Sequence, residues 1–128
     1  MRLRPALFAI AMTVSASMAQ AAECMRANEE GEIAEGTLSL GDFADAAGRP
    51  EQAFILTLPV PTCLGGSDEE ESVESTTTIH VFSTDEAVAE SIEKFVGQSV
   101  QVRGSPFSAH TAHHHAPIVM DISEIDAI

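Results

Sequence analysis

Residues 76–104, TTTIHVFSTDEAVAESIEKFVGQSVQVRG, predict a strand, a helix and a second strand in immediate succession. Residues 76–82 are rich in β-branched side chains, which favour a strand. Residues 99–104 alternate apolar and polar residues, so Val100 and Val102 are expected to face inward. A strand-helix-strand unit of this length places one helix inside an otherwise β-rich chain.

The helix between these strands has recognisable ends. Ser83 and Glu86 fit a capping box, in which Ser83 is the N-cap and Glu86 reaches back to it. Gly97 is well placed to cap the C-terminus. The apolar residues at helical spacing, expected to face the core, are Val88, Ile92 and Phe95.

Three further strands are predicted on either side of this unit, at residues 32–40, 53–58 and 118–125. Pro59 and Pro61 are expected to stop the second of them from continuing as a central strand. The complete order is therefore β-β-β-α-β-β. That order is typical of a small, partly open five-stranded barrel of the OB type, with one helix between strands three and four. A flatter α+β sheet has the same linear order and is the alternative.

The N-terminus predicts an export signal over residues 1–22. Arg2 and Arg4 precede an apolar core, and Ala19-Gln20-Ala21 is a small-x-small cleavage site. The apolar stretch is shorter than the roughly 20 residues that a spanning helix needs, so no transmembrane segment is expected in the mature chain. We expect one domain over residues 23–128, periplasmic or secreted. Lipid attachment at Cys24 is the less favoured alternative, because Glu23 before it is large and charged.

The chain has two cysteines, Cys24 and Cys63. In an exported protein an even count favours a disulfide. Such a bond would close a loop of about 40 residues, worth on the order of 4 kcal/mol in the chain-entropy model. The alternative is two free thiols, one of them reactive.

The charge balance is strongly acidic. The full chain carries a formal net charge of −14, from 6 basic and 20 acidic residues. Loss of Arg2 and Arg4 leaves 4 basic residues and a charge of 4 − 20 = −16. This charge argues against nucleic acids and anionic membranes and leaves cations, cationic proteins or neutral ligands as partners, although simple solubility explains it equally well. Residues 65–76 are expected to form a flexible acidic loop, whose contiguous carboxylates do not match a calcium loop.

Four of the five histidines lie within the run His110-Thr-Ala-His113-His114-His115. The run connects the last two predicted strands, the connection that helps to line the binding face in OB barrels. If it is extended, His113 and His115 share a face; if it turns, His110 and His114 converge. Neither pattern is a named zinc spacing.

Three interpretations of this run compete. The first is a zinc or copper site made by two or three of these imidazoles, with an acidic residue such as Asp121. The second is structural, with one histidine bonded to backbone and the others solvated. The third is a pH-responsive or partner-binding surface. His80 is expected to be an ordinary strand residue.

No arrangement of residues predicts catalysis. There is no nucleophile elbow and no spacing that pairs two carboxylates as acid and base. A small exported binding module is therefore favoured over an enzyme. An inhibitor-type protein-interaction module that uses its acidic surface is the alternative, and a hydrolase with a metal-activated water is a third.

The segment Gly104-Ser-Pro-Phe107, followed by Ala109-His-Thr-Ala-His-His-His-Ala-Pro117, resembles the signature of the DUF4431 family. Residues 35–38 and 54–63 resemble the same family's first strand, its second strand and its cysteine. The likeness extends over nearly all of the predicted mature chain, and departs from the pattern at Pro106 and in the length of the acidic loop. It implies an exported bacterial domain of unassigned function, in which His110, His113, His114 and His115 act as a unit.

Overall fold

A computed structural model describes residues 23–128. The predicted export signal over residues 1–22 lies outside the described residues. Among the residues that are described, no helix has the length and apolar character needed to cross a membrane. The elements in chain order are β1 (Met25–Arg26), β2 (Glu32–Ala44), β3 (Pro50–Gly65), β4 (Val73–Phe82), α1 (Glu86–Lys94), β5 (Ser99–Ser108) and β6 (Ile118–Ala127).

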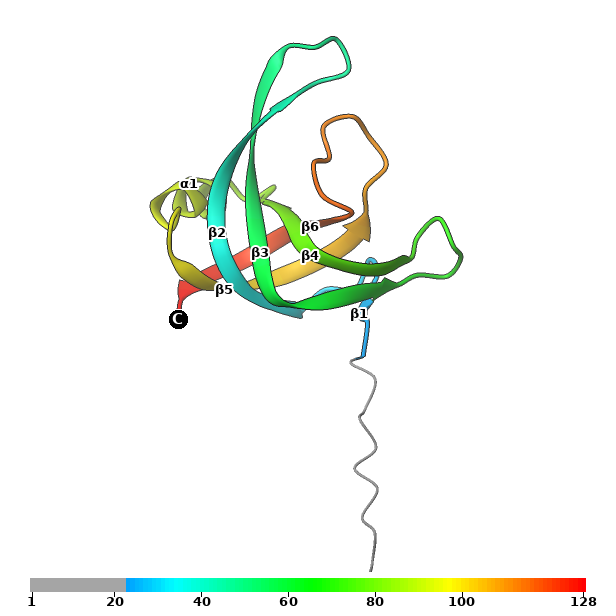
Figure 1. The fold of residues 1–128 in the computed structure, drawn as a ribbon. Coiled ribbons are helices and arrows are strands. Elements are labelled where there is room, and N and C mark those ends of the chain that lie inside the picture. Colours follow the sequence, from blue (N-terminus) through cyan, green and yellow to red (C-terminus); the bar gives the residue numbers. More distant parts are fainter. Residues whose placement is uncertain (1–22) are drawn as a thin grey trace, which may run out of the picture.

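Five of these strands form a barrel with α1 on its outside (Figure 1). Around the barrel the order is β3-β2-β5-β6-β4, and β4 pairs back onto β3. All of these pairings are antiparallel except that of β4 with β6, which is parallel. The prediction of a small mainly β barrel with one helix between its third and fourth strands is thus confirmed. The remaining strand, β1, pairs with β3 alone and is not one of the five strands that close the barrel.

The prolines do not end β3, contrary to the sequence-based expectation. The strand continues through Pro59 and Pro61 to Gly65. Pairing of β3 with β2 stops at Thr57, and its pairing with β4 shifts register between Thr57 and Thr62. Both prolines therefore lie where the regular pairing is interrupted, and a missing N–H is tolerated at such an irregularity.

The helix is present, but its ends differ from the prediction. Asp85 is the N-cap, and its side chain accepts the N–H of Val88 at 3.1 Å. Ser83 instead donates its hydroxyl to the carbonyl of Ile122 on β6, at 2.6 Å. The C-cap is Phe95. Gly97 has a left-handed φ of 87° and donates its N–H to Leu38 on β2, so it directs the chain back to the barrel rather than capping the helix.

The barrel is filled by apolar side chains that follow the predicted alternation. Val100 and Val102 on β5 are fully buried, and Ile92 fixes α1 to the same core. On β6 the inward residues Ile118, Met120 and Ile122 belong to this core. Burying a side chain of this size contributes roughly 1.5–3 kcal/mol, so the barrel interior is the main source of stability.

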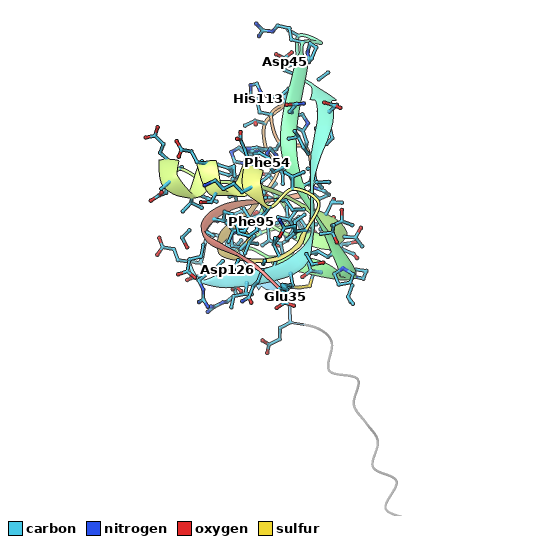
Figure 2. All side chains as sticks on the ribbon, turned by 90° about the vertical axis from the view of Figure 1, so that its left-hand side faces the viewer. Glu35, Asp45, Phe54, Phe95, His113 and Asp126 are labelled. Carbon is cyan, nitrogen blue, oxygen red and sulfur yellow. A yellow bond between two sulfur atoms is a disulfide. The ribbon has the colours of Figure 1, made fainter. Side chains whose placement is uncertain are left out.

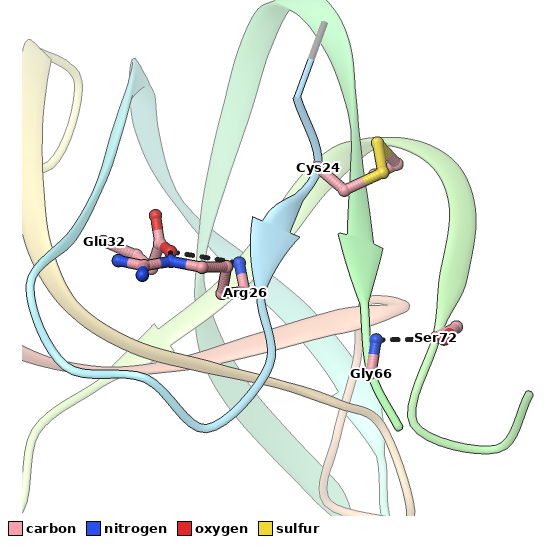
Figure 3. The surroundings of a disulfide bond; sticks show 6 residues. Cys24, Arg26, Glu32, Gly66 and Ser72 are labelled. Atoms are coloured by element: carbon pink, nitrogen blue, oxygen red, sulfur yellow. Dashed lines mark hydrogen bonds and ion pairs between the residues drawn. A yellow bond between two sulfur atoms is a disulfide. The ribbon is translucent and has the colours of Figure 1, made fainter. Parts of the chain in front are cut away.

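The disulfide between Cys24 and Cys63 is present and joins positions 39 residues apart, as predicted (Figure 3). It attaches the start of the described chain to the end of β3. Directly after it, Met25 pairs with Leu64 in a short parallel ladder. The N-terminal end of the domain is therefore held by one covalent bond and one strand pairing.

The acidic loop is shorter than the predicted 65–76. It covers residues 66–72, because β4 begins at Val73. Its ends are joined by a hydrogen bond from the Gly66 N–H to Ser72 Oγ at 3.0 Å (Figure 3). Glu71 accepts the hydroxyl of Ser67 at 2.5 Å. These bonds give a compact turn in which the remaining carboxylates are exposed.

Candidate functional site

The connection between β5 and β6, residues 109–117, is called the His-rich loop below. It lies beside the long β2–β3 hairpin, whose turn at residues 45–49 is called the hairpin tip (Figure 1). Figure 2 shows Asp45 at this tip and His113 beside the same hairpin. The two connections that flank the binding face of OB barrels are therefore neighbours in this protein.

The His-rich loop covers an apolar row on the outside of the barrel. Ile55, His80, Val119 and Phe107 are neighbours in register across β3, β4, β6 and β5. Val119 is fully buried although it alternates with the core residues of β6, so something outside the barrel must shield it. Ala116 of the His-rich loop is also buried and packs with Ile55 in a second, smaller apolar cluster. The loop is thus packed against the sheet.

Glu51, at the start of β3, joins the hairpin to the His-rich loop. Its Oε1 contacts His113 Nδ1 at 2.5 Å and its Oε2 contacts His115 Nε2 at 2.6 Å. The side chain of His115 is only 9% exposed, whereas that of His113 is 66% exposed. One carboxylate therefore accepts hydrogen bonds from two imidazoles, one inside the packing and one at the surface.

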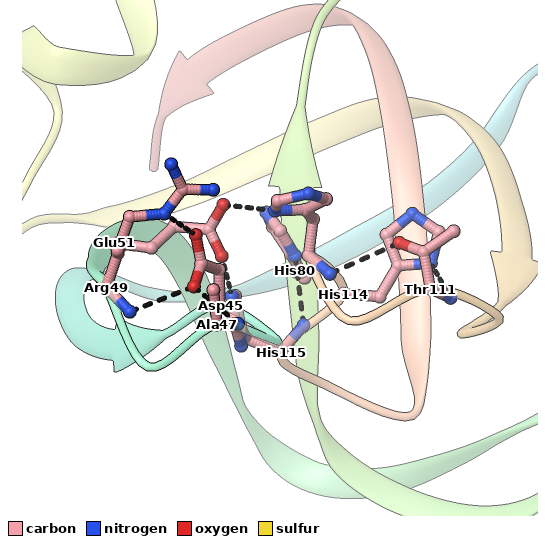
Figure 4. Close-up of polar contacts among 9 residues, drawn as sticks. Asp45, Ala47, Arg49, Glu51, His80, Thr111, His114 and His115 are labelled. Atoms are coloured by element: carbon pink, nitrogen blue, oxygen red, sulfur yellow. Dashed lines mark hydrogen bonds and ion pairs between the residues drawn. The ribbon is translucent and has the colours of Figure 1, made fainter.

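Glu51 holds the ring of His115 by a hydrogen bond (Figure 4), and stacking also holds this ring. The ring lies on Phe43 with a centroid distance of 4.3 Å and an interplanar angle of 9°. The ring of His80 also lies against that of His115, with a centroid distance of 5.8 Å. The backbone N–H of His115 donates to His80 Nδ1 at 3.2 Å. His80, which the sequence predicts to be an ordinary strand residue rather than a ligand, does lie on β4, and its ring also supports the His-rich loop.

His110 and His114 form a second group within the loop. Nδ1 of His114 accepts the backbone N–H groups of His110 and Thr111, at 3.0 and 3.3 Å. The two imidazole rings meet edge to face at 4.7 Å. The sequence pattern offered either this pair or the pairing of His113 with His115, and the folded loop contains both.

Two of these histidines have a defined tautomer. His80 and His114 each use Nδ1 to accept a backbone N–H, so their neutral rings carry the proton on Nε2. Burial lowers the pKa of His80, and the nearby His115 and His114 lower it further. Burial also lowers the pKa of His114, together with the neighbouring imidazoles, His110 first. Protonation at Nδ1 would replace an acceptor by a donor and break these backbone bonds.

The carboxylates beside the loop are held in the ionised form. Hydrogen bonds from His115 and then from His113 lower the pKa of Glu51. At the hairpin tip, hydrogen bonds from the backbone N–H groups of Arg49 and Ala47 lower the pKa of Asp45, which also pairs with the Arg49 side chain at 3.0 Å (Figure 4). The predominant charge beside the loop is therefore negative.

Asp121 does not join the histidines, contrary to the sequence-based suggestion. Its carboxylate accepts the N–H and the hydroxyl of Thr84, both at 3.1 Å, near the start of α1. Across residues 23–128, no group of three or more His, Cys, Asp or Glu side chains is placed to hold a metal ion as it stands. The four loop histidines instead divide into the two groups described above.

Sequence reasoning missed Glu51 and Phe43. Glu51 is 62 and 64 positions away from its histidine partners, and no spacing rule connects them. The signal that was present is topological: in an OB-type barrel the first hairpin and the last connection lie side by side. That rule would have directed attention to the acidic and aromatic residues at the end of the hairpin.

Comparison with family models gives a match over part of the chain. Residues 78–126 match the DUF4431 model, described as a domain of unknown function. A search of curated proteins finds no match to the chain. The matched segment comprises most of β4, α1, β5, the His-rich loop and nearly all of β6. The segments at 35–38 and 54–63, which also resembled this family, lie outside it. The match therefore supports the resemblance to the DUF4431 family over residues 78–126, which include the entire His-rich loop.

Proposed function

We propose that this protein is an exported binding module and that its His-rich loop takes a divalent metal ion, zinc or copper. Glu51, His113 and His115 are the proposed ligands. The observation that carries the proposal is the contact of one carboxylate with two imidazoles from a distant part of the chain. Imidazole nitrogen and carboxylate oxygen are donors that zinc accepts, and imidazole suits copper as well.

The other two loop histidines are less suited to this role. Nδ1 of His114 already accepts two backbone N–H groups, so its second nitrogen carries a proton. Nδ1 of His110 contacts the carbonyl of Ser108 at 3.1 Å and so already has a backbone partner. The proposed site therefore uses two of the four predicted histidines and adds Glu51.

Metal binding requires a defined rearrangement. The nitrogen-oxygen contacts of 2.5 and 2.6 Å are hydrogen bonds that contain protons. Around a tetrahedral zinc, ligand atoms lie roughly 3.3 Å apart, because each metal-ligand bond is about 2.0–2.1 Å. The exposed His113 side chain can make this movement. Each proton must move from the nitrogen that faces Glu51 to the other nitrogen of its ring, which frees a lone pair for the metal. A doubly protonated imidazole cannot bind the metal, so the proposal predicts that binding weakens in acid.

Calorimetric titration of the untagged protein with zinc and with copper tests the proposal. Wild type is expected to bind one ion, and Glu51→Gln and His113→Ala are each expected to weaken binding by about tenfold or more. His110→Ala is the matched control, since it removes an imidazole from the same loop without touching Glu51. The proposal fails if wild type binds neither metal, or if His110→Ala is as damaging as His113→Ala.

A further inference from the structure

A hollow lies at the start of the His-rich loop, and Glu51 is not among the residues that line it. It has a volume of about 340 Å³ and is lined by Asn28, Glu71, Phe107, Ser108 and His110. These residues come from the turn after β1, the acidic loop, the end of β5 and the start of the His-rich loop. The volume is at the lower end of the range for ligand pockets, so a small group would fill it.

The walls of this hollow are held in position by hydrogen bonds between the segments. Asn28, with a left-handed φ of 61°, donates its backbone N–H to the carbonyl of Pro106 on β5 at 2.7 Å. Ser108 donates its hydroxyl to the carbonyl of Glu70 in the acidic loop at 2.7 Å. Two distant segments are thus attached to the end of β5, and the hollow between them is a built feature of the fold.

The polar groups of the hollow are rich in acceptors. Nδ1 of His110 faces a carbonyl, which can only accept, so the neutral ring keeps its proton there and Nε2 is an acceptor. Glu71 contributes a carboxylate, of which Oε2 accepts the hydroxyl and the N–H of Ser67. The Ser108 hydroxyl already donates its hydrogen bond to Glu70, so toward a ligand it can only accept. A ligand that complements these groups must be rich in donors.

The aromatic residue and the negative charge around the hollow indicate that the ligand is positively charged. Phe107 is the aromatic residue of the lining, and aromatic rings attract ammonium groups. The acidic loop that supplies Glu71 also carries the exposed carboxylates of Asp68, Glu69 and Glu70. A donor-rich cation satisfies the acceptors, the ring and the negative potential together.

We propose that this hollow binds a primary ammonium group, carried either by a free diamine or by the lysine side chain of another protein. The three N–H donors of the ammonium would pair with Glu71 and with the other acceptors, while its alkyl chain lies along Phe107. This site does not depend on the proposed metal site, because it shares no side chain with Glu51, His113 and His115.

Titration followed by amide NMR, with EDTA present throughout, tests the proposal using 1,5-diaminopentane as the probe. Saturable shifts are expected at Asn28, Glu71 and Ser108. Glu71→Gln is expected to weaken binding by about tenfold, because it removes the charge but keeps an acceptor for Ser67. Glu69→Gln is the matched control, since it removes the same charge from the same loop outside the hollow, and less than a threefold change is expected.

Two further experiments test the role of Phe107 and distinguish a free amine from a protein lysine. Phe107→Leu is expected to weaken binding at least threefold, and 1-pentanol, which lacks the charge, is expected not to bind. A lysine-containing peptide that binds at least tenfold more tightly than the diamine indicates a protein partner, and a weaker one indicates a free amine. Absence of saturable binding by the diamine and the peptide overturns the proposal. Equal losses for Glu69→Gln and Glu71→Gln, or an unchanged affinity in Phe107→Leu, also overturn it.

Discussion

At the scale of single residues, His80 and Glu51 determine how the His-rich loop is held. His80 accepts a backbone N–H of the loop and supports the ring of His115, while Glu51 accepts hydrogen bonds from two loop side chains. The sequence made the loop histidines conspicuous and left these partners inconspicuous. An isolated histidine or glutamate on a strand has no local pattern that distinguishes a structural contact from a solvated side chain.

Replacing His80 by phenylalanine is expected to lower the free energy of unfolding by about 1–2 kcal/mol, because the partly buried N–H of His115 loses its acceptor. His80→Asn, whose Oδ1 can occupy the position of Nδ1, is expected to recover part of this loss. Urea denaturation of both variants measures the difference. Equal stability of His80→Phe and wild type would show that the hydrogen bond contributes nothing.

At the scale of elements, the predictable parts were those with local signals. The β-branched run of β4 and the alternation in β5 each predicted the correct strand, and the spacing of Val88, Ile92 and Phe95 predicted α1, of which Phe95 is the C-cap. The predicted ends of elements were wrong where a contact with a distant part of the chain replaces the expected local one. Ser83 caps no helix because Ile122 offers it a carbonyl, and β3 continues past Pro59 because the regular pairing is interrupted there.

The His-rich loop is expected to lose stability in acid. The ordinary pKa of histidine is 6.5, and the pKa values of His80 and His114 are lower than this in the folded protein. The folded state then binds fewer protons than the unfolded chain, so their contribution is complete above pH 6.5 and is lost as pH falls below it. The contribution of Glu51 is lost later, below its ordinary pKa of 4.5.

An NMR titration of the imidazole ring protons, together with urea denaturation at each pH, measures this effect. The resonances of His80 and His114 are expected to titrate below 6.5, and the free energy of unfolding to decline over the same interval. A titration of His80 at or above 6.5 would be incompatible with its role as an acceptor.

The close approach of β5 to β6 at Gly104 gives a second prediction at this scale. The register of the pair shifts between Arg103 and Gly104, and a Cβ on Gly104 would overlap the backbone of Asp121 and Ile122. Gly104→Ala is therefore expected to lower the free energy of unfolding by about 1–3 kcal/mol through overpacking. Gly65→Ala is the control, since its Cβ would meet its nearest neighbour, Cys24 Cβ, at 3.7 Å. Similar melting temperatures for the two variants would contradict the prediction.

At the scale of the whole molecule, the barrel and the disulfide were predictable and the assembly of the site was not. The order of elements restricts a chain of this length to few topologies, and two cysteines allow only one pairing. The position of the His-rich loop against the hairpin depends on packing over the row of Ile55, His80, Val119 and Phe107. That packing brings together residues from four strands, which no local pattern encodes.

Removal of the disulfide is expected to destabilise the entire domain. Cys24→Ser with Cys63→Ser opens a loop whose ends are 39 positions apart, and the expected loss is about 2–4 kcal/mol of unfolding free energy. Thermal denaturation of the double variant, compared with oxidised wild type, measures it. An unchanged melting temperature would show that the β1–β3 pairing alone holds the N-terminal end.

The most direct test of the proposed function is an anomalous difference map from crystals of the untagged protein grown with zinc. The proposal predicts one strong peak within bonding distance of Glu51, His113 and His115, with the two nitrogen-oxygen contacts lengthened to roughly 3.3 Å. A fully occupied zinc ion elsewhere, with the hydrogen bonds of Glu51 to both histidines intact, would contradict it.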